Sequence, residues 1–326
     1  MKEPLVEYEV IGCFGTIIGH IVQFLWQFAI FLLTLQANNR LQKMNRLSHS
    51  FQLLLFSLIV LLPTVAQGQI VSSHGVFDPD SVRQDWSNQP YFSLYKDNYF
   101  VIGPPLFYGK PTAQNTNVKF QISVQQRLTN ATLPGGTYLY LFYSQKCFWN
   151  VLEESLPMTD LNFNPGIGIC KPIFVKNRYI GKLSMMIEHE SNGKDSIASR
   201  SWNKISFAGN IMLTPNINVA AKFWIPIIDG ENNRDILKYC GICQASAQYV
   251  SDNRRFSAGL TLVKREGWDL SYNTIVELAY RFSRKENQCI FLQYYNGYGE
   301  GLLDYKVFKS QIRIGIVIRP KLFSDF

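Results

Sequence analysis

Apolar and polar residues alternate at every second position in repeated stretches from residue 118 to the end of the chain. The stretch 118–125 places valine, phenylalanine, isoleucine and valine on one parity and lysine, glutamine, serine and glutamine on the other. The same pattern recurs at 217–225, 256–262, 272–282 and 308–318. A period of two predicts β-strands, because successive side chains of a strand point to opposite faces of the sheet.

The polar face of these strands carries full charges. In the last stretch, Lys309 and Arg313 share one parity, while Ile312 and Ile314 share the other. A transmembrane barrel turns its apolar face to lipid and its polar face to the lumen, whereas a sandwich requires an apolar interior. We therefore predict an all-β fold, a transmembrane antiparallel up-and-down β-barrel. Units of about 20 residues per strand and turn give about twelve strands, and closure requires an even number.

Both ends of the chain bear on export to a membrane. The chain stops at Phe326, and a terminal strand ending in an aromatic residue resembles the assembly signal of bacterial outer-membrane barrels. From Met44, a basic start, an apolar run and a small-residue exit follow one another, which is the pattern of a signal peptide. We predict a signal peptide at 44–68, cleaved after Ala66 or after its last residue, ahead of a single barrel domain at 69–326.

The first 43 residues form an apolar extension that two hypotheses explain. Its stretch Val10–Leu35 is long enough to span a bilayer as a helix. Residues 1–43 are then either an additional helix or translated sequence ahead of a true start at Met44. We favour the second, because a signal peptide rarely follows another membrane segment. Beyond Gln69 no apolar run reaches the ~18 residues of a spanning helix.

The charge distribution argues against a nucleic-acid partner, and the cysteine spacing argues against a zinc site. The formal net charge is +8, but basic residues are scattered rather than clustered. We therefore predict no nucleic-acid partner, whereas anionic headgroups and lipopolysaccharide suit the charge. Cys240 and Cys243 fall on opposite faces of a strand and have no second pair to join them. We expect no zinc site.

Three polar residues interrupt the apolar face of one predicted hairpin. If the segment 182–207 is a hairpin symmetric about Ser196, His189 lies opposite Asn203. Directly paired side chains are ~4.5–5.5 Å apart, which allows an amide to hold an imidazole. Ser191 follows His189 on the same face of its strand.

These three groups are the components of a serine hydrolase. A serine hydroxyl is a weak nucleophile until an imidazole takes its proton, and a third group must fix the tautomer of that imidazole. On the lipid side of a barrel, such a nucleophile meets acyl lipids. The alternative is that His189, Ser191 and Asn203 only mark the exit of the strands into headgroups and water. The functional hypothesis is favoured because His189 is the only histidine after His74.

Further motifs surround the trio. They are His-Glu-Ser-Asn-Gly at 189–193, Ser-Arg-Ser-Trp-Asn at 199–203, Gly-Tyr-Gly-Glu at 297–300 with Leu-Asp-Tyr at 303–305, and Glu-Glu-Ser at 153–155 followed by Pro157. With these motifs, the chain resembles the bacterial outer-membrane phospholipase A family from about Gly135 to Phe326, with weaker likeness back to about Gln84, which covers most of the predicted exported body.

The resemblance implies a twelve-stranded barrel in the outer membrane. It implies a calcium-dependent enzyme, active as a homodimer, that hydrolyses the sn-1 and sn-2 acyl esters of phospholipids and also lysophospholipids. By the same resemblance Ser191 is the nucleophile, His189 the general base and then acid, and Asn203 the residue that orients the imidazole.

The resemblance also assigns supporting residues. Where the family has an acidic residue near the metal, this chain has Asn232. The implied set is Gly193 for its N–H at the oxyanion, Gln145 as support for Asn203, and Lys194, Ser199, Asn232 and Ser155 of the partner subunit as the surroundings of Ca2+.

Two alternatives to the enzyme remain open at this point. One is a non-enzymatic outer-membrane barrel, acting as a pore or as an adhesion or assembly protein, whose polar trio only contacts headgroups. The other is a soluble β protein, because sandwiches also alternate.

Overall fold

The structure is a computed structural model that describes residues 91–129, 133–175, 178–228, 231–283 and 287–319. The predicted extension at 1–43 and signal peptide at 44–68 lie outside these residues, as does Phe326. Among the described residues, no helix has the length and apolar character needed to cross a membrane.

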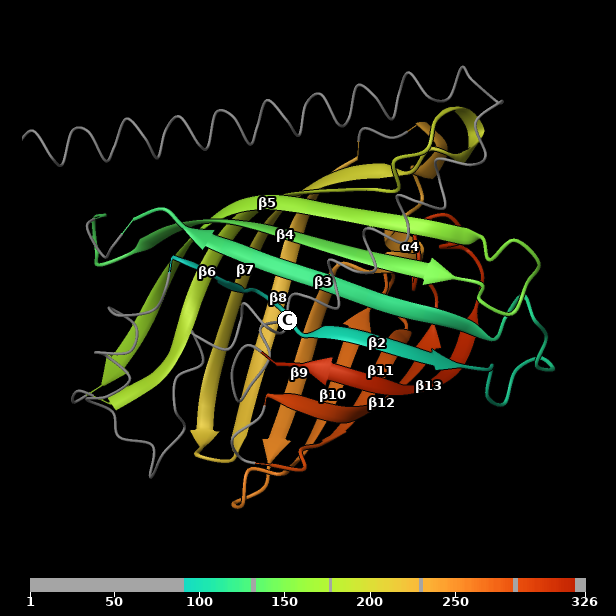
Figure 1. The fold of residues 1–326 in the computed structure, drawn as a ribbon. Helices are drawn as coiled ribbons and strands as arrows, with labels where there is room; N and C mark the ends of the chain where they lie inside the picture. Colours follow the sequence, from blue (N-terminus) through green and yellow to red (C-terminus); the bar gives the residue numbers. More distant parts are fainter. Residues whose placement is uncertain (1–90, 130–132, 176–177, 229–230, 284–286, 320–326) are drawn as a thin grey trace, which may run out of the picture. The chain divides into compact units, whose positions relative to one another are not determined.

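The described residues form a closed antiparallel barrel of twelve strands (Figure 1). Each strand from β2 to β13 pairs with the next one along the chain, and β13 pairs with β2 to close the sheet. This confirms the predicted all-β barrel of about twelve strands. The strands are β2 (Asn98–Gly103), β3 (Asn117–Arg127), β4 (Tyr138–Trp149), β5 (Met158–Val175), β6 (Arg178–Ser191), β7 (Ser201–Thr214), β8 (Ile217–Ile227), β9 (Cys243–Val250), β10 (Phe256–Lys264), β11 (Tyr272–Tyr280), β12 (Gln288–Gly297) and β13 (Lys309–Ile318).

A short additional strand, β1 (Phe92–Leu94), continues the line of β2. Both strands pair with β3, with Phe92 opposite Gln126 and Tyr99 opposite Gln121. The first barrel strand is therefore interrupted, and β1 does not add a thirteenth position to the ring.

The alternation in the sequence matches the two faces of the wall. On β6, Leu183 and Ile187 are 54% and 56% exposed, while Met186 and Glu188, the two neighbours of Ile187, are buried. The exposed parity faces outward, and the buried parity faces the lumen. Strand pairing already provides the hydrogen bonds of the backbone, so only side chains meet the lipid. An apolar outer face is therefore the one that suits a membrane.

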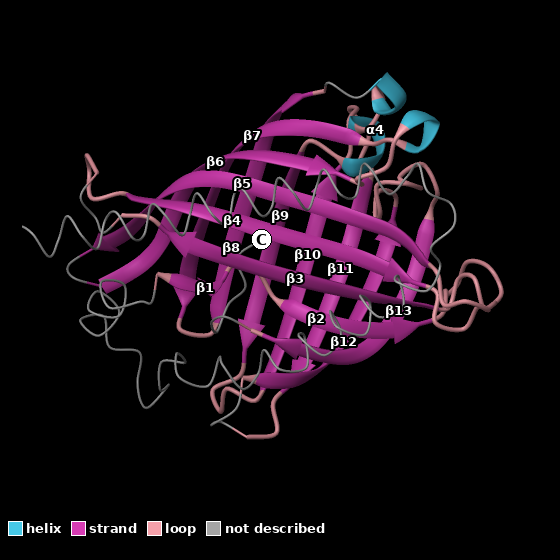
Figure 2. Ribbon diagram, turned by 45° about the horizontal axis from the view of Figure 1, so that its top comes forward, coloured by secondary structure: helices cyan, strands magenta, loops and turns pink. Residues whose placement is uncertain are grey.

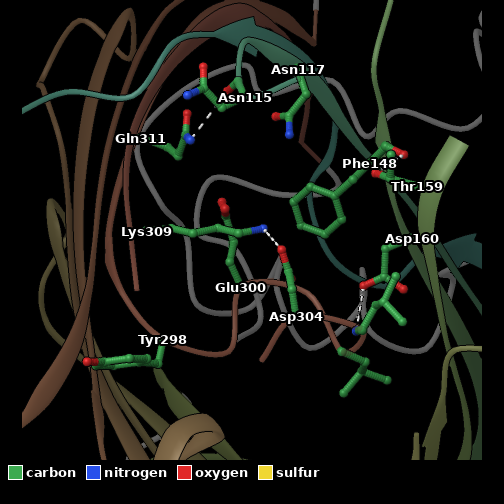
Figure 3. A network of polar contacts seen from close by, with 12 residues as sticks. Asn115, Asn117, Phe148, Thr159, Asp160, Tyr298, Glu300, Asp304, Lys309 and Gln311 are labelled. Atoms are coloured by element: carbon green, nitrogen blue, oxygen red, sulfur yellow. Dashed lines mark hydrogen bonds and ion pairs between the residues drawn. The ribbon is translucent and has the colours of Figure 1, made fainter. Parts of the chain in front are cut away.

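Charged side chains fill part of the lumen. The carboxylate of Glu300 lies 2.6 Å from the Arg313 guanidinium and 3.1 Å from the Lys119 ammonium, and all three side chains are almost completely buried. The loop that carries Glu300 also contacts β5, where Asp160 accepts a hydrogen bond from the Leu303 N–H at 3.0 Å (Figure 3). The loop between β12 and β13 is thus held inside the barrel.

The two ends of the barrel differ in their connections. The longest loops connect the strands at one end, where the short helices η1 (Ser196–Ala198), η2 (Glu231–Asn233) and α4 (Leu237–Cys240) also lie (Figure 2). Bacterial outer-membrane barrels have short periplasmic turns and longer extracellular loops. The long-loop end, which includes the β6–β7 loop, therefore corresponds to the extracellular end. The loops at this end are 104–116, 150–157, 192–200, 228–242, 265–271 and 298–308.

Candidate active site

His189 and Asn203 contact one another across the β6–β7 hairpin. The two residues are direct partners in the sheet, and His189 Nδ1 lies 2.8 Å from Asn203 Oδ1. This pairing is the one that a hairpin symmetric about Ser196 requires. Because an amide oxygen only accepts hydrogen bonds, the contact assigns the ring proton to Nδ1 and leaves Nε2 as the basic nitrogen.

Both residues lie on the outward face of the wall. His189 continues the parity of the exposed Ile187, whereas Glu188 beside it is buried in the lumen. On β7, the neighbours of Asn203 are Trp202 and Lys204, and both are buried on the inner face. The imidazole and amide therefore face the surface that lipid surrounds.

Ser191 follows His189 on this outward face at the end of β6. It lies opposite Ser201 of β7 on one side and opposite Phe163 of β5 on the other. The backbone groups of Ser201 point away from β6, because they bond to the side chain of Asn233. The Ser191–Ser201 pair is therefore a non-hydrogen-bonded one, and His189–Asn203, two residues further along each strand, is of the same kind. Side chains approach each other most closely in such pairs.

The loop after Ser191 is closed by a buried asparagine. Asn192 donates to the Ala198 carbonyl at 2.8 Å and accepts from the Arg200 N–H at 3.0 Å. Its side chain thus joins the two ends of the loop, and only 3% of the residue is exposed. Asn192 belongs to the His-Glu-Ser-Asn-Gly motif, but the sequence alone did not assign it a role.

Gly193 has a backbone conformation that favours glycine. Its φ is +63°, in the left-handed region. A Cβ at this position would lie 2.8 Å from the ring of Phe163. Backbone conformation and space therefore both favour glycine at position 193, two residues after Ser191.

The residues expected around calcium lie on three loops of the long-loop end. Lys194 and Ser199 are in the β6–β7 loop, Ser155 is in the β4–β5 loop, and Asn232 is in η2. Asn232 reaches the β6–β7 loop, because its amide donates to the Ser196 carbonyl at 2.8 Å. The described residues contain no group of three or more His, Cys, Asp or Glu side chains that could hold a metal.

Gln145 lies on β4, two strands away from Ser191. It accepts a hydrogen bond from the Tyr143 hydroxyl at 2.9 Å, and its amide nitrogen lies 3.4 Å from the Cys147 sulfur. Phe163 stands between Gln145 and Ser191 in the sheet register. These contacts do not include Asn203, so the supporting role of Gln145 stays a prediction.

Comparison with known proteins identifies the family. The family model of phospholipase A1 matches residues 90–318. Phospholipase A1 of Escherichia coli K12 is 25% identical over 281 residues, which cover 80% of this chain and 95% of that protein. Phospholipase A1 of Salmonella typhimurium is 26% identical over 279 residues, which cover 79% and 94%.

Solved structures show the same fold. Outer membrane phospholipase A from Escherichia coli superposes with a TM-score of 0.61 at 24% identity, over 70% of this chain and 98% of that one. The Salmonella typhi outer membrane phospholipase dimer with bound calcium gives a TM-score of 0.64 at 24% identity, over 76% and 100%. The family match favours the enzyme over the non-enzymatic barrel and the soluble protein. This chain belongs to the phospholipase A1 family of outer-membrane ester hydrolases.

Proposed function

We propose that the protein is a calcium-dependent phospholipase that hydrolyses the sn-1 and sn-2 acyl esters of phospholipids and lysophospholipids. Ser191, His189 and Asn203 act as its catalytic triad on the lipid-facing surface. The observation that carries this proposal is the 2.8 Å contact between His189 Nδ1 and Asn203 Oδ1 on an otherwise apolar outer face. Polar side chains on a surface that faces lipid are unfavourable, so a function is the simplest reason for them.

The proposed proton transfers all pass through the imidazole of His189. Asn203 holds the Nδ1 proton of His189, so Nε2 is the nitrogen proposed to accept the proton of Ser191, which lies two residues further along the same face of β6. The Ser191 oxygen attacks the acyl carbonyl as its proton passes to Nε2. The imidazolium then gives that proton to the departing lysophospholipid oxygen, which leaves an acyl ester on Ser191. Water, deprotonated by the same nitrogen, hydrolyses this ester and releases the fatty acid.

A neutral third residue suits this place in the wall. Asn203 orients the ring without adding a negative charge to a surface that faces lipid. Within the triad, only the imidazole therefore changes its charge during the catalytic step. A carboxylate at the same position would be less favourable next to hydrocarbon.

The Gly193 N–H is the proposed oxyanion donor, and its substitution is testable. Gly193→Ala introduces a side chain at φ +63° and against Phe163, which displaces this N–H from the nucleophile. Loss of an oxyanion donor lowers kcat by about 10²–10³-fold. We expect such a loss in fatty-acid release from phospholipid in detergent, with the folded barrel retained. Wild-type kcat in the alanine variant would remove Gly193 from the mechanism.

The donors near the nucleophile fit calcium in kind. Lys194 offers a carbonyl, Ser199 a hydroxyl and Asn232 an amide oxygen whose nitrogen is already engaged with Ser196. Calcium takes 6–8 oxygen ligands. One chain thus supplies only part of the set, and Ser155 of the partner subunit and water would supply the rest. When bound, calcium contributes positive charge that stabilises a developing oxyanion.

A homodimer is the proposed active state because the metal set is incomplete in one chain. The related Salmonella typhi structure is described as a dimer with bound calcium. Outer-membrane phospholipid is the proposed substrate, and lipopolysaccharide is a proposed neighbour that matches the net charge of +8.

A calcium titration of hydrolysis tests the metal assignment. We expect a chelator to abolish fatty-acid release from dispersed phospholipid and added Ca2+ to restore it. We also expect Asn232→Asp to reach half-maximal activity at about tenfold lower calcium, because a carboxylate adds charge to a neutral donor set. Ser155→Ala should instead need more calcium. Full activity in the presence of chelator would contradict the metal assignment.

A further inference from the structure

The side chain of Asn233 completes the sheet at the first residue of β7. Asn233 is the last residue of η2 and is fully buried, with 0% of its surface exposed. Its Oδ1 accepts from the Ser201 N–H at 3.3 Å, and its Nδ2 donates to the Ser201 carbonyl at 2.9 Å. One amide therefore satisfies both backbone groups of one strand residue.

Asn233 bonds Ser201 just beyond the described pairing of β7 with β8. Among the described residues, the register between β7 and β8 runs as far as Asn203 opposite Ile227, the last residue of β8. A strand residue opposite Ser201 would exchange one donor and one acceptor with it. The amide of Asn233 offers the same two groups in the same place, which fixes the start of β7.

The segment that carries Asn233 is itself anchored. Ile236 is fully buried and packs with Trp202 and Tyr305 in one apolar cluster at the long-loop end. The Tyr305 hydroxyl donates to Asp235 at 2.5 Å, and the Lys306 ammonium lies 2.8 Å from the same carboxylate. Asp235 and Ile236 therefore attach the segment that follows Asn233 to the β12–β13 loop, which is held inside the barrel.

We propose that Asn233 is a positioning residue for the hydrolysis described above, and this inference rests on that proposed function. Ser201 lies directly opposite Ser191, and Asn203 follows it by two residues on the same face. Fixing the backbone of Ser201 therefore fixes the distance between the nucleophile and the residue that orients the imidazole. A misplacement of about 1 Å lowers the rate about 10²-fold.

The test compares two asparagine variants in the full-length protein, refolded in detergent with calcium. Asn233→Ala should lower kcat on dispersed phospholipid about 10- to 100-fold and leave KM within about twofold, because substrate contacts are unchanged. Asn216→Ala is the matched control. Asn216 also bonds a strand carbonyl, that of Val250 at 2.8 Å, but at the opposite end of the barrel. The kcat of the Asn216→Ala variant should equal that of the wild type.

A double variant shows whether Asn233 acts through Asn203. If it does, Asn233→Ala should change kcat less than about threefold in an Asn203→Ala background, because residues that act as one unit are not additive. Equal losses in both backgrounds, or wild-type kcat in Asn233→Ala, would overturn the proposal.

Folding and catalysis are separated by two further measurements. Heat-modified electrophoretic mobility reports whether each barrel is folded. Asn233→Asp keeps the acceptor for the Ser201 N–H but opposes its carbonyl, so it should also show a reduced kcat. If neither variant folds, Asn233 is required for folding and the proposal fails. Ser191→Ala in the same assay tests the triad alone. Retained activity of this variant would refute the proposed function, whereas the assignment of Asn233 is tested by its own variants.

Discussion

Ser191→Ala is expected to lower phospholipid hydrolysis by about 10⁴-fold or more while leaving the barrel folded. The hydroxyl is the group that forms the acyl-enzyme, and removal of a triad nucleophile commonly has an effect of at least this size. Alanine in place of Ser191 lies at the end of β6 on the outer face, where it removes no lumen contact. The measurement is fatty-acid release from phospholipid in detergent with saturating calcium.

Ser184→Ala is the matched control for this substitution. Ser184 lies on the same strand with the opposite parity, facing the lumen, and pairs with Ala208. It should retain wild-type activity. Hydrolysis by Ser191→Ala at more than about a tenth of the wild-type rate would assign the nucleophile to another residue.

Glu300→Ala is expected to produce the largest loss of stability, a decrease of about 3–5 kcal/mol in the free energy of unfolding. The substitution leaves the Arg313 and Lys119 cations buried without their shared carboxylate. Unfolding by guanidinium in detergent micelles measures this change. Asp304→Ala is the control, because Asp304 pairs with Lys309 at 2.7 Å but is 39% exposed. It should lower stability by less than about 1 kcal/mol, and equal losses in the two variants would contradict the account.

The pH dependence of this effect has a defined sign. Burial acts to raise the pKa of Glu300, but the charges of Arg313 and Lys119 outweigh it and hold the pKa far below its ordinary value of 4.5. A carboxylate with a lowered folded-state pKa contributes its stability fully above the unfolded pKa and loses it as the pH falls. The difference in unfolding free energy between wild type and Glu300→Gln should therefore stay constant from pH 7 to about pH 5 and shrink in stronger acid. A difference that vanishes near pH 6 would show that Arg313 and Lys119 do not hold the pKa of Glu300 below its ordinary value.

The wall of the barrel was predictable because its signal is local and periodic. Alternation at 118–125 and in later stretches assigns each residue to lipid or lumen, and a slip of one residue would reverse both faces. The same periodicity, with a loop symmetric about Ser196, gives the β6–β7 register and thus the pairing of His189 with Asn203. The interruption between β1 and β2 was not predicted, since those strands are short and weakly alternating.

The loops were less predictable because their contacts join distant parts of the chain. Asn233 reaches Ser201 and Asp160 reaches Leu303, and no spacing rule connects such positions. A buried asparagine in a polar loop also resembles any solvated asparagine in the sequence. The support of Asn203 by Gln145 came from resemblance alone, and the side-chain hydrogen bonds of Gln145 lie within its own strand.

Covalent labelling tests most directly whether a nucleophilic serine with an imidazole beside it faces lipid. The reagent is a long-chain alkyl fluorophosphonate added to the calcium-loaded protein in detergent, and mass spectrometry of the digested protein locates the adduct. We predict stoichiometric labelling of Ser191, a parallel loss of hydrolysis, and no labelling in the His189→Ala variant. Labelling of a different serine, or full hydrolysis by protein whose Ser191 carries the adduct, would contradict the account.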